Sequence, residues 1–562
     1  MTALYWCNVC EHVLKSEEQL RQCPHCGRPL GSMATDIRPV FARERHILEF
    51  YGHGDLSKTI VWRGSHNQYY YINGQSVEAP SSAQLKGDLS TLRAYLNESD
   101  HYDTLDERLI AYYRRALEVN RSCLASLESE AIEFIQQVRS RFHNHPCLVS
   151  FSGGKDSTVV SDLVRRALHP EQITHIFSDT TLEDLNTYAY IRRFREQNPL
   201  VSFWEARSEK NFFALVGEIG PPSRVMRWCC TIFKTGPINN LLQSFGEKKV
   251  LTFYGIRRRE SQRRSQYDRV GANSDKPGHV LAVDPDDDQH GVTVGAKIGQ
   301  QITASPILDW SEFDVWLYIL LHGLDFNDAY RWGFSRVGCW LCPLNSRWSE
   351  FLTRLYFPEE ADRWREQLIG FARRIGKPDP EEYVDDRAWT RRFGGAGMTN
   401  RFAGLDTRPC GEVDDAVQIT LRRPVVQKEL LEFLKPLGHV DIARSQMALG
   451  KMILEARRDN GCSELMVQAI KGDNTLRVTV LDSRDPDRVI SHVRSQAIKY
   501  QTCIRCSACA AACPHGAIIV STDPDLYEID ETRCTGCLEC VTHFGSTGCL
   551  VAKSLSVYGE SV

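Results

Sequence analysis

The chain has none of the features that mark membrane, secreted or repeat proteins. No apolar run reaches the roughly 18 residues that a membrane-spanning helix needs. The first residues, MTALYWCNVC, contain neither a charged segment nor a long apolar one, so no signal peptide is predicted. No internal repeat is evident. We therefore expect a cytoplasmic protein with no membrane partner, and 562 residues suffice for about three or four domains.

The chain also has no excess of positive charge. Its formal net charge is −4, with 25% charged and 42% hydrophobic residues, as in ordinary globular proteins. A global basic field that would attract nucleic acid is therefore absent, although a local basic patch remains compatible with these numbers.

Cysteine, in contrast, is abundant, with 20 residues. Their spacings are those of metal sites rather than of a disulfide framework. Sixteen of the 20 fall into four sets. We interpret the other four as ordinary thiols; these are Cys123, Cys147, Cys410 and Cys462.

The first set is a pair of Cys-x2-Cys knuckles, Cys7 with Cys10 and Cys23 with Cys26. Gly27 after the second knuckle permits a tight turn. Two such hairpins place four thiolates tetrahedrally, which suits structural Zn²⁺. A zinc ribbon is therefore predicted, and a rubredoxin-like iron site is the alternative.

The second and third sets lie near the C-terminus, in CIRCSACAAACP and CTGCLEC. Their spacing matches two-cluster bacterial ferredoxins, in which the fourth cysteine of each run serves the other cluster. The first [4Fe–4S] cluster is assigned to Cys503, Cys506, Cys509 and Cys549. The second is assigned to Cys513, Cys534, Cys537 and Cys540. Cys549 follows Cys540 by more residues than usual and precedes no proline.

The fourth set combines adjacent Cys229 and Cys230 with Cys339 and Cys342 of VGCWLCP. A disulfide between adjacent cysteines is strained and rare. Adjacent thiolates can instead bind two different irons of one cubane, so the four residues are candidate ligands of a third [4Fe–4S] cluster. Two pairs of buried thiols are the alternative.

Residues 151–160 read FSGGKDSTVV and overlap the end of an apolar run, CLVSF. Apolar residues at helical spacing follow, so the glycines are expected at a turn between a buried strand and a helix. Lys155, Asp156 and Ser157 at such a helix start suit an anion. The sequence is not the Walker pattern, which needs GxxxxGK followed by Ser or Thr.

Strand and helix signals alternate after residue 146, which predicts an α/β core with a mostly parallel sheet. Small cysteine-bearing, β-rich and α+β units surround it. We predict a zinc ribbon (1–30), a β-rich domain (31–103), a catalytic domain (104–350), a helical and irregular extension (351–412), an α+β domain (413–495) and a ferredoxin domain (496–562).

Six motifs of this core, in order, resemble the phosphoadenosine phosphosulfate (PAPS) reductase family of PP-loop enzymes. They are SGGKDS (152–157), FSDTTLEDLNTYAYI (177–191), RWCCTIFKTGPI (227–238), GIRRRESQRR (255–264), SPILDWSEFDVWLYI (305–319) and GFSRVGCWLCP (333–343). The resemblance implies a Rossmann-like fold of the adenine nucleotide α-hydrolase type. It also implies a [4Fe–4S] cluster on the fourth cysteine set, as in assimilatory adenylyl-sulfate reductases and the DNA-phosphorothioation member of the family.

In the enzymes that this core resembles, the SGGxDS turn grips the β,γ-pyrophosphate of ATP while a nucleophile attacks the α-phosphorus. The resemblance implies nucleotide contacts from Ser152, Gly153, Gly154, Lys155, Asp156, Ser157, Asp179, Arg257 and Arg263. Lys155, Asp156 and Arg257 are the expected catalytic residues, because charge on the leaving pyrophosphate must be stabilised. Asp156 orients the loop or helps hold Mg²⁺. The arginine run consists of Arg257, Arg258, Arg259, Arg263 and Arg264, and a solvated charged face is the alternative for it.

The sequence departs from the reductases of this family in two ways. It lacks their ECGLH-type tail with its mobile catalytic cysteine, and RPCGE around Cys410 does not match it. Its PP-loop is intact, whereas that of reductases is usually degraded. Both departures favour an enzyme that cleaves ATP to AMP and pyrophosphate and so activates an acceptor for sulfur transfer, with electrons from its own ferredoxin domain.

Two other functions remain open: a ferredoxin-coupled reductase of adenylyl sulfate or PAPS to sulfite, and a non-catalytic electron-transfer or scaffold protein. The expected cofactors are ATP with Mg²⁺ (or a sulfonucleotide), Zn²⁺ and the [4Fe–4S] clusters. The sulfur acceptor, which the sequence does not identify, is a nucleic acid or a small molecule, and a protein electron donor is a further candidate partner.

Overall fold

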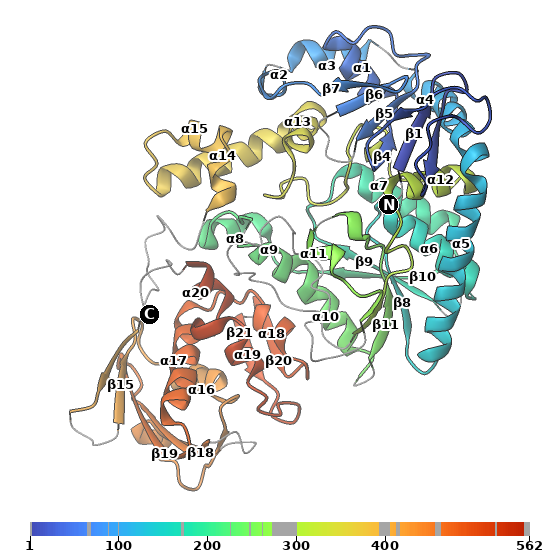
Figure 1. Ribbon diagram of the computed structural model, residues 1–562. Helices are drawn as coiled ribbons and strands as arrows, with labels where there is room; N and C mark the ends of the chain where they lie inside the picture. Colours follow the sequence, from blue (N-terminus) through green and yellow to red (C-terminus); the bar gives the residue numbers. More distant parts are fainter. Residues whose placement is uncertain are drawn as a thin grey trace.

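The computed structural model describes residues 3–64, 69–87, 89–98, 101–169, 173–224, 226–246, 249–260, 262–271, 301–392, 405–411, 416–455, 462–522 and 525–555. Two lobes are visible in Figure 1, one built on the central parallel sheet and one formed by the orange and red C-terminal elements. None of the helices in these ranges combines the length and apolar character needed to span a bilayer.

The core sheet has six strands in the order β10-β9-β8-β11-β13-β12. Its pairs are parallel except at the edge, where β12 runs antiparallel to β13. The strands are β8 (Cys147–Ser150), β9 (Thr174–Asp179), β10 (Ser202–Arg207), β11 (Val250–Phe253), β12 (Val270–Gly271) and β13 (Gln301–Ala304). The predicted α/β fold with a mostly parallel sheet is confirmed.

Three helices pack on one another beside this sheet: α5 (Arg115–Arg141), α6 (Lys155–Ala167) and α12 (Glu312–His322). Their apolar faces belong to one buried cluster with the strand residues Val149, Leu251 and Ile302. α7 (Leu185–Gln197) follows β9. This packing fixes the N-terminal ends of α6 and α12 near the carboxyl ends of the strands, where parallel sheets bind ligands.

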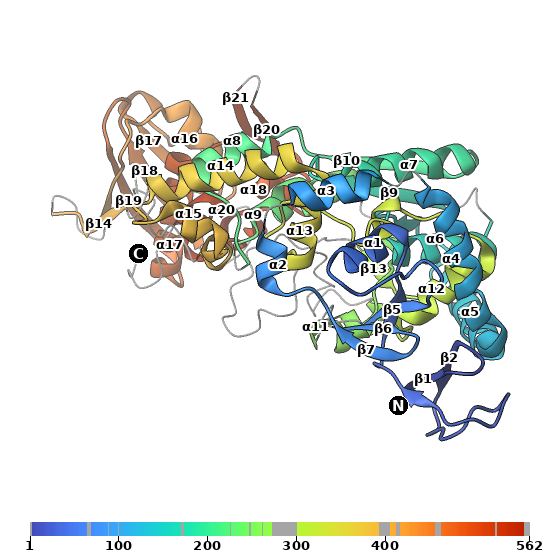
Figure 2. The same ribbon diagram turned by 90° about the horizontal axis from the view of Figure 1, so that it is seen from above.

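Two small sheets precede the core. The first has β1 (Ala3–Cys7), β2 (His12–Ser16) and β3 (Gly31–Ser32); the second has β4 (Ile37–Pro39), β5 (Val61–Gly64), β6 (Tyr69–Ile72) and β7 (Gln75–Glu78). Helices α1 (Ala42–Phe50), α2 (Ser82–Lys86), α3 (Ser90–Asn97) and α4 (Tyr102–Tyr113) accompany them (Figure 2). Asn73 and Gly74 form the β6–β7 turn with φ of 47° and 80°, as their sequence predicts.

The helical extension consists of α13 (Arg347–Tyr356), α14 (Pro358–Arg374) and α15 (Pro380–Asp385), drawn yellow in Figure 1. The antiparallel sheet that follows has the order β14-β15-β19-β18-β17-β16. Its strands are β14 (Asp406–Pro409), β15 (Ala416–Thr420), β16 (His439–Val440), β17 (Lys451–Glu455), β18 (Cys462–Ala469) and β19 (Thr475–Ser483). Helices α16 (Gln427–Leu434) and α17 (Pro486–Thr502) accompany it, and α17 runs continuously across position 495.

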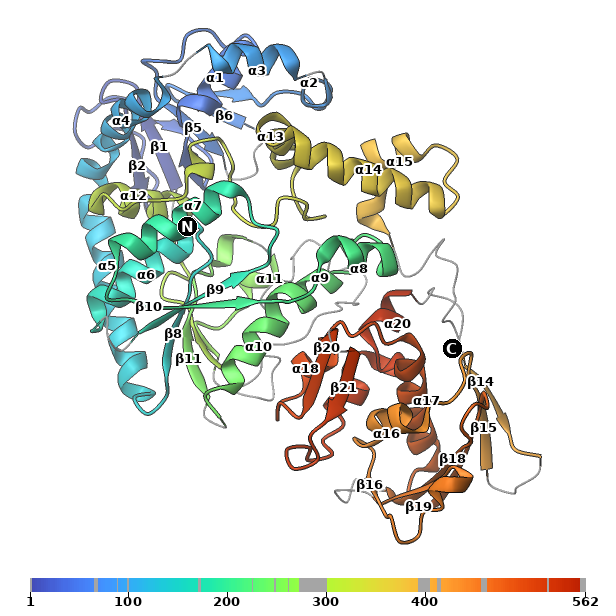
Figure 3. The same cartoon turned by 180° about the vertical axis from the view of Figure 1, so that it is seen from behind.

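The cysteine-dense C-terminal segment contains α18 (Ala508–Ala512), β20 (Ile518–Thr522), β21 (Asp525–Ile529), α19 (Glu539–Thr542) and α20 (Leu550–Leu555). It packs against the green helices of the core lobe, α8 (Phe212–Ile219), α9 (Trp228–Cys230) and α10 (Gly236–Gln243) (Figure 3). Asn239 on α10 donates a hydrogen bond to the backbone oxygen of Ala511 (2.8 Å), and Gln243 donates one to that of Cys513 (3.2 Å). The C-terminal unit is therefore joined to the helix that follows Cys229 and Cys230.

Candidate functional site

The predicted anion-binding loop lies between β8 and α6. Gly153 has a φ of 74°, a left-handed conformation that glycine adopts without strain, and Gly154 is the N-cap of α6. The backbone N–H of Lys155 donates to the Tyr330 hydroxyl at 2.9 Å. A side chain at Gly255 would come within 2.7 Å of the Asp156 backbone, so glycine there lets the 255–264 segment approach the loop. The loop is thus a preformed turn at a helix start, the geometry that favours phosphate.

Charged side chains converge on this helix start. Lys155 Nζ lies 3.1 Å from Asp156 Oδ2 and 3.3 Å from a carboxylate oxygen of Glu312. Arg257 Nε donates to Asp156 Oδ1 at 2.6 Å and lies near Asp36, with 3.8 Å between the closest nitrogen and oxygen. The structure therefore brings Arg257 to the adjacent residues Lys155 and Asp156, although Arg257 follows Asp156 by 101 positions in the sequence.

Burial and ion pairing set the protonation of this group. Burial raises the pKa of Asp156, but the Arg257 and Lys155 charges outweigh it and lower that pKa to about 2. The pKa of Lys155 is raised, because Asp156 and Glu312 outweigh the effect of its burial. Burial and the Glu312 charge raise the pKa of Asp36 to about 6, against the opposing effect of Arg257. Two cations and an ionised Asp156 therefore face the helix start at neutral pH.

The other proposed nucleotide residues have varied surroundings. Ser157 Oγ donates to the Gly154 oxygen at 2.8 Å and lies 3.3 Å from Ser152 Oγ, so both hydroxyls belong to the loop. Asp179 ends β9, where its Oδ1 accepts from the Thr181 N–H (2.8 Å) and the Tyr188 hydroxyl (2.7 Å). The side chain of Arg263 lies outside the described part of the chain.

The rest of the arginine run makes local contacts. Arg258 pairs with Asp309 at 2.8 Å on the surface, and Arg259 donates to the Thr35 oxygen at 3.0 Å. Arg264 pairs with Glu260. Within this run, Arg257 donates a hydrogen bond to the loop residue Asp156.

The fourth cysteine set is gathered in one place. The hydrogen bond from the Cys229 thiol, aided by the Arg227 and Lys234 charges, lowers the pKa of Cys230 to about 6 despite its burial. Burial raises the pKa of Cys339, as do Glu183 and the thiols of Cys342 and Cys230. Each of these thiols influences the pKa of another member of the set, so the four lie in one region of the protein. The residues after Cys230, Thr231–Thr235, form a π-helical turn, a feature frequent at functional sites.

Two polar residues of the β9–α7 connection face this set. Thr180 Oγ1 lies 3.3 Å from Cys339 Sγ, and an isolated β-bridge pairs Glu183 with Cys339. Burial, the largest influence on Glu183, raises its pKa to about 7. The fourth set therefore lies at the carboxyl end of β9, the strand next to the one that carries the PP-loop.

The C-terminal cysteines line two separate cavities. One is lined by Cys503, Cys506, Cys509 and Cys549, and the other by Cys513, Cys534, Cys537 and Cys540. Each cavity thus contains the four cysteines that the spacing groups together, and their role as cluster ligands stays a prediction. Soft thiolates in sets of four suit iron–sulfur clusters, so the donor chemistry fits that cofactor.

The N-terminal set is the most compact. The sulfurs of Cys7, Cys10, Cys23 and Cys26 all lie within 4.8 Å of one another. Four thiols this close fit a single tetrahedral ion, and within the described residues no other group of metal-binding side chains meets that distance. Of the unassigned thiols, Cys147 and Cys410 are buried and Cys123 is half-buried, while the Cys462 side chain lies outside the described part.

Three participants in the PP-loop region are absent from the sequence prediction: Asp36, Glu312 and Tyr330. Glu312 lies within the motif SPILDWSEFDVWLYI, which could have directed attention to it. Asp36 comes from the N-terminal β-rich segment and accepts hydrogen bonds from the backbone N–H groups of Glu312 and Phe313 at the start of α12. No sequence pattern connects it to the loop.

Comparison with known proteins agrees with this arrangement. Residues 146–345 match the phosphoadenosine phosphosulfate reductase domain, and residues 502–543 match the 4Fe-4S dicluster domain. An uncharacterized protein of Methanocaldococcus jannaschii is 30% identical over 293 residues, which are 51% of this chain and 55% of that protein. The chain thus spans about half the length of this relative.

Two further similarities concern the core. Sulfate adenylyltransferase subunit 2 of Vibrio atlanticus is 27% identical over 221 residues, which are 37% of this chain and 67% of that protein. The crystal structure of PAPS reductase from Candida auris is 16% identical and covers 39% of this chain and 95% of that one, with a TM-score of 0.27. The domain matches at residues 146–345 and 502–543 show that the chain combines a domain of the phosphoadenosine phosphosulfate reductase family with a 4Fe-4S dicluster domain.

Proposed function

We propose that this protein cleaves ATP between the α- and β-phosphates, releasing pyrophosphate, and thereby activates an acceptor for sulfur transfer. The observation that carries the proposal is the convergence of Lys155, Asp156 and Arg257 on a left-handed glycine turn at the start of α6. The name of the Vibrio relative, a sulfate adenylyltransferase subunit, supports chemistry at the α-phosphate.

Each loop residue has a defined task in this proposal. The Gly153–Gly154 turn and the α6 N-terminus hold the β- and γ-phosphates, and the Lys155 ammonium neutralises charge on the leaving pyrophosphate. Asp156, ionised and bonded to Arg257, fixes the guanidinium toward the phosphates; with a phosphate oxygen it also offers a ligand for Mg²⁺. Ser152 and Ser157 add hydroxyl donors, and Asp179 and Arg263 are proposed contacts to the nucleoside side.

The reaction balances in two steps. An acceptor carbonyl oxygen attacks the α-phosphorus, the bond to the bridging oxygen breaks, and pyrophosphate leaves. Hydrosulfide then adds at the activated carbon and displaces AMP, so that sulfur replaces the oxygen. If sulfur arrives as a persulfide, two electrons are needed to regenerate the carrier thiol.

The cysteine sets would hold the clusters that deliver those two electrons. We propose Cys229, Cys230, Cys339 and Cys342 as ligands of a core [4Fe–4S] cluster, and the two C-terminal sets as ligands of ferredoxin clusters, with Zn²⁺ on Cys7, Cys10, Cys23 and Cys26. Bound clusters would supply low-potential electrons. The polypeptide holds the C-terminal cysteine-bearing unit against the core through the contact between α10 and α18.

The second candidate function is reduction of adenylyl sulfate or PAPS to sulfite. The match to a PAPS reductase domain favours it. In that reaction the two electrons reduce the sulfonucleotide, and no pyrophosphate is formed. The two functions therefore differ in products, AMP and pyrophosphate against sulfite.

The deciding experiment incubates the anaerobically purified protein with α-labelled ATP and Mg²⁺. We expect labelled AMP together with pyrophosphate, lost in Lys155→Ala and retained in Lys428→Ala, because Lys428 is exposed on the distant helix α16. If ADP were the only labelled product, or if the ATP stayed intact, the adenylylation mechanism would be wrong. Sulfite release from adenylyl sulfate or PAPS without ATP would then establish the second function.

A further inference from the structure

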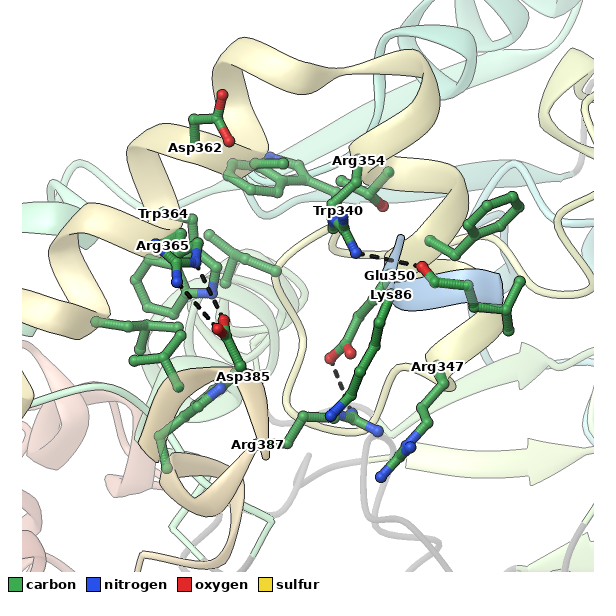
Figure 4. Close-up of a pocket in the computed structure, with 18 of the residues that line it drawn as sticks. Lys86, Trp340, Arg347, Glu350, Arg354, Asp362, Trp364, Arg365, Asp385 and Arg387 are labelled. Atoms are coloured by element: carbon green, nitrogen blue, oxygen red, sulfur yellow. Dashed lines mark hydrogen bonds and ion pairs between the residues drawn. The ribbon is translucent and has the colours of Figure 1, made fainter. Parts of the chain in front are cut away.

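A cavity of about 510 Å³ opens between the helical extension and the fourth cysteine set. It is lined by residues of α2, α13, α14 and α15 and by the segment Trp340–Cys342 (Figure 4). Its volume falls within the roughly 300–1,000 Å³ of small-molecule sites. Cys342, one of the four core cysteines, is part of its wall. A ligand in this cavity would therefore lie against the core cysteine set.

Aromatic side chains form much of the wall. Trp340, Phe351, Trp364 and Trp389 line the cavity, and the rings of Trp364 and Trp389 meet edge to face with 5.8 Å between centroids. Trp364 is 7% exposed, yet its buried indole N–H has no hydrogen-bond partner among the described residues. Because an unpaired buried donor is costly, it indicates that a ligand acceptor completes the site.

The charged lining has more cations than anions. The cations are Lys86, Arg347, Arg354, Arg365 and Arg387, and the anions are Glu350, Asp362 and Asp385. Three of the five cations are paired: Arg387 with Glu350 at 2.9 Å, Arg365 with Asp385 at 3.1 Å and Lys86 with Asp386 at 3.1 Å. Arg347 is exposed, and its guanidinium forms no hydrogen bond or ion pair within the described part of the chain (Figure 4).

We propose that this cavity binds the sulfur acceptor, and that the acceptor is a small aromatic anion. Its ring lies among Trp340, Trp364 and Trp389, and its negative group lies on Arg347. This inference rests on the proposed function, because it names the acceptor's chemical class and places the acceptor beside the core cysteines. The volume of about 510 Å³ is that of a small-molecule site, which favours a small molecule over a polymer.

The site can be tested with 8-anilinonaphthalene-1-sulfonate, an aromatic anion, and N-phenyl-1-naphthylamine, its uncharged counterpart. In anaerobic equilibrium dialysis of the intact holoprotein, without ATP, we expect saturable binding of one sulfonate probe and at least tenfold weaker binding of the neutral one. Arg347→Glu should weaken sulfonate binding at least tenfold. Trp364→Phe, which removes only the donor and part of the ring, should weaken it several-fold.

Arg363→Glu is the matched control. Arg363 is exposed on the same helix as Trp364 but contacts Phe213 outside the cavity, so its replacement should leave binding unchanged. Equal affinity for the two probes, or unchanged binding in Arg347→Glu, would overturn the assignment. Displacement of the probe by a single-stranded oligonucleotide but not by uridine monophosphate would also overturn it, in favour of a polymer.

Failure of this inference is distinguishable from failure of the proposed function. Pyrophosphate release without probe binding would overturn the cavity assignment alone. Probe binding without any pyrophosphate release would overturn the acceptor role together with the proposed function. As a second readout, the sulfonate probe should alter the paramagnetic resonance spectrum of the reduced protein, because Cys342 is in the cavity wall; an unchanged spectrum would contradict the placement.

Discussion

Arg257 Nε lies 2.6 Å from Asp156 Oδ1; the Arg257 side chain is buried and that of Asp156 is 16% exposed. This pair joins the GIRRRES segment to the PP-loop. Asp156 keeps Lys155 as a second cationic partner, so removing Arg257 should cost less than the about 3–5 kcal/mol of leaving a fully buried charge unpaired. We expect Arg257→Met to lower pyrophosphate release by about 100-fold or more, the effect of losing one preorganised charge at a reacting phosphate. Product release from labelled ATP is the measurement.

The neighbouring arginine provides the control for this experiment. Arg258 pairs with Asp309 and donates to the backbone oxygens of Ser265 and Tyr267, so Arg258→Met should lower the free energy of unfolding by about 1–3 kcal/mol. Its pyrophosphate release should equal that of the parent protein. Equal activity of Arg257→Met and Arg258→Met would contradict a role for Arg257 at the loop.

The contact between the two lobes yields a second prediction. Asn239 is buried and donates to the Ala511 oxygen, whereas Asn240 on the same helix is exposed. Asn239→Ala leaves that oxygen unpaired, so we expect the free energy of unfolding of the C-terminal unit to fall by about 1–3 kcal/mol. Hydrogen exchange of amides in α10 and α18 should speed up, with the iron content unchanged. Asn240→Ala should exchange like the parent, and identical exchange in both variants would refute the docking role.

Sequence patterns anticipate the local features because each depends on residues close together in the chain. The apolar run before Gly153 and the helical spacing after it define the β8–α6 turn, and Asn73–Gly74 defines a hairpin. Regular cysteine spacing likewise anticipates which sulfurs lie together. These features need no knowledge of the tertiary fold.

Contacts between residues far apart in the chain could not be predicted from the sequence. Asp36 reaches the start of α12, whose residue Glu312 is 276 positions away, and both carboxylates face the PP-loop cations. Hydrophobic periodicity reports which face of an element is buried, but not which element covers it. The cavity behind Cys342 has the same origin, because it exists only once α2 packs on α13.

The N-terminal cysteine set leads to a third prediction. Cys10→Ser should remove one equivalent of zinc while leaving iron unchanged, as measured by elemental analysis. Lys15 in the adjacent strand β2 pairs with buried Asp314 of α12 at 2.7 Å, so loss of the metal should also expose the first sheet to limited proteolysis. Cys123→Ser, outside every cysteine set, should retain zinc. Iron loss in Cys10→Ser would indicate a rubredoxin-like site instead.

Buried His175 predicts a pH dependence of stability. Burial, aided by the Arg165 charge, lowers its pKa from 6.5 to about 3, and the ring hydrogen-bonds with Ser161 at 2.8 Å. Below pH 6.5 His175 binds a proton in the unfolded chain but not in the folded protein. The free energy of unfolding therefore falls as the pH decreases toward 3. The slope from this one group approaches about 1.4 kcal/mol per pH unit.

Denaturant titrations at pH 7.5, 6.5 and 5.5 measure this slope. The double variant His175→Phe with Ser161→Ala cannot take up the proton and leaves no unpaired hydroxyl. Its free energy of unfolding should therefore vary less with pH than that of the parent. His322→Phe is the comparison, because His322 is partly exposed and pairs with Glu128. A slope in the double variant as steep as in the parent would exclude His175 as the source.

Lys499 lies where it can influence both C-terminal cysteine sets. It is 2% exposed, lines the cavity of Cys503 and Cys549, and donates to the backbone oxygen of Cys540 in the other set. A buried positive charge favours the more negative, reduced state of a nearby cluster and raises its potential.

We expect Lys499→Met, which keeps the side-chain volume, to shift both ferredoxin potentials to more negative values in an anaerobic redox titration. Lys428→Met, at an exposed position of α16, should leave them unchanged. If only one potential moved, the ammonium would serve a single cluster; if neither did, its charge would be compensated within the fold and its role confined to the hydrogen bond with Cys540.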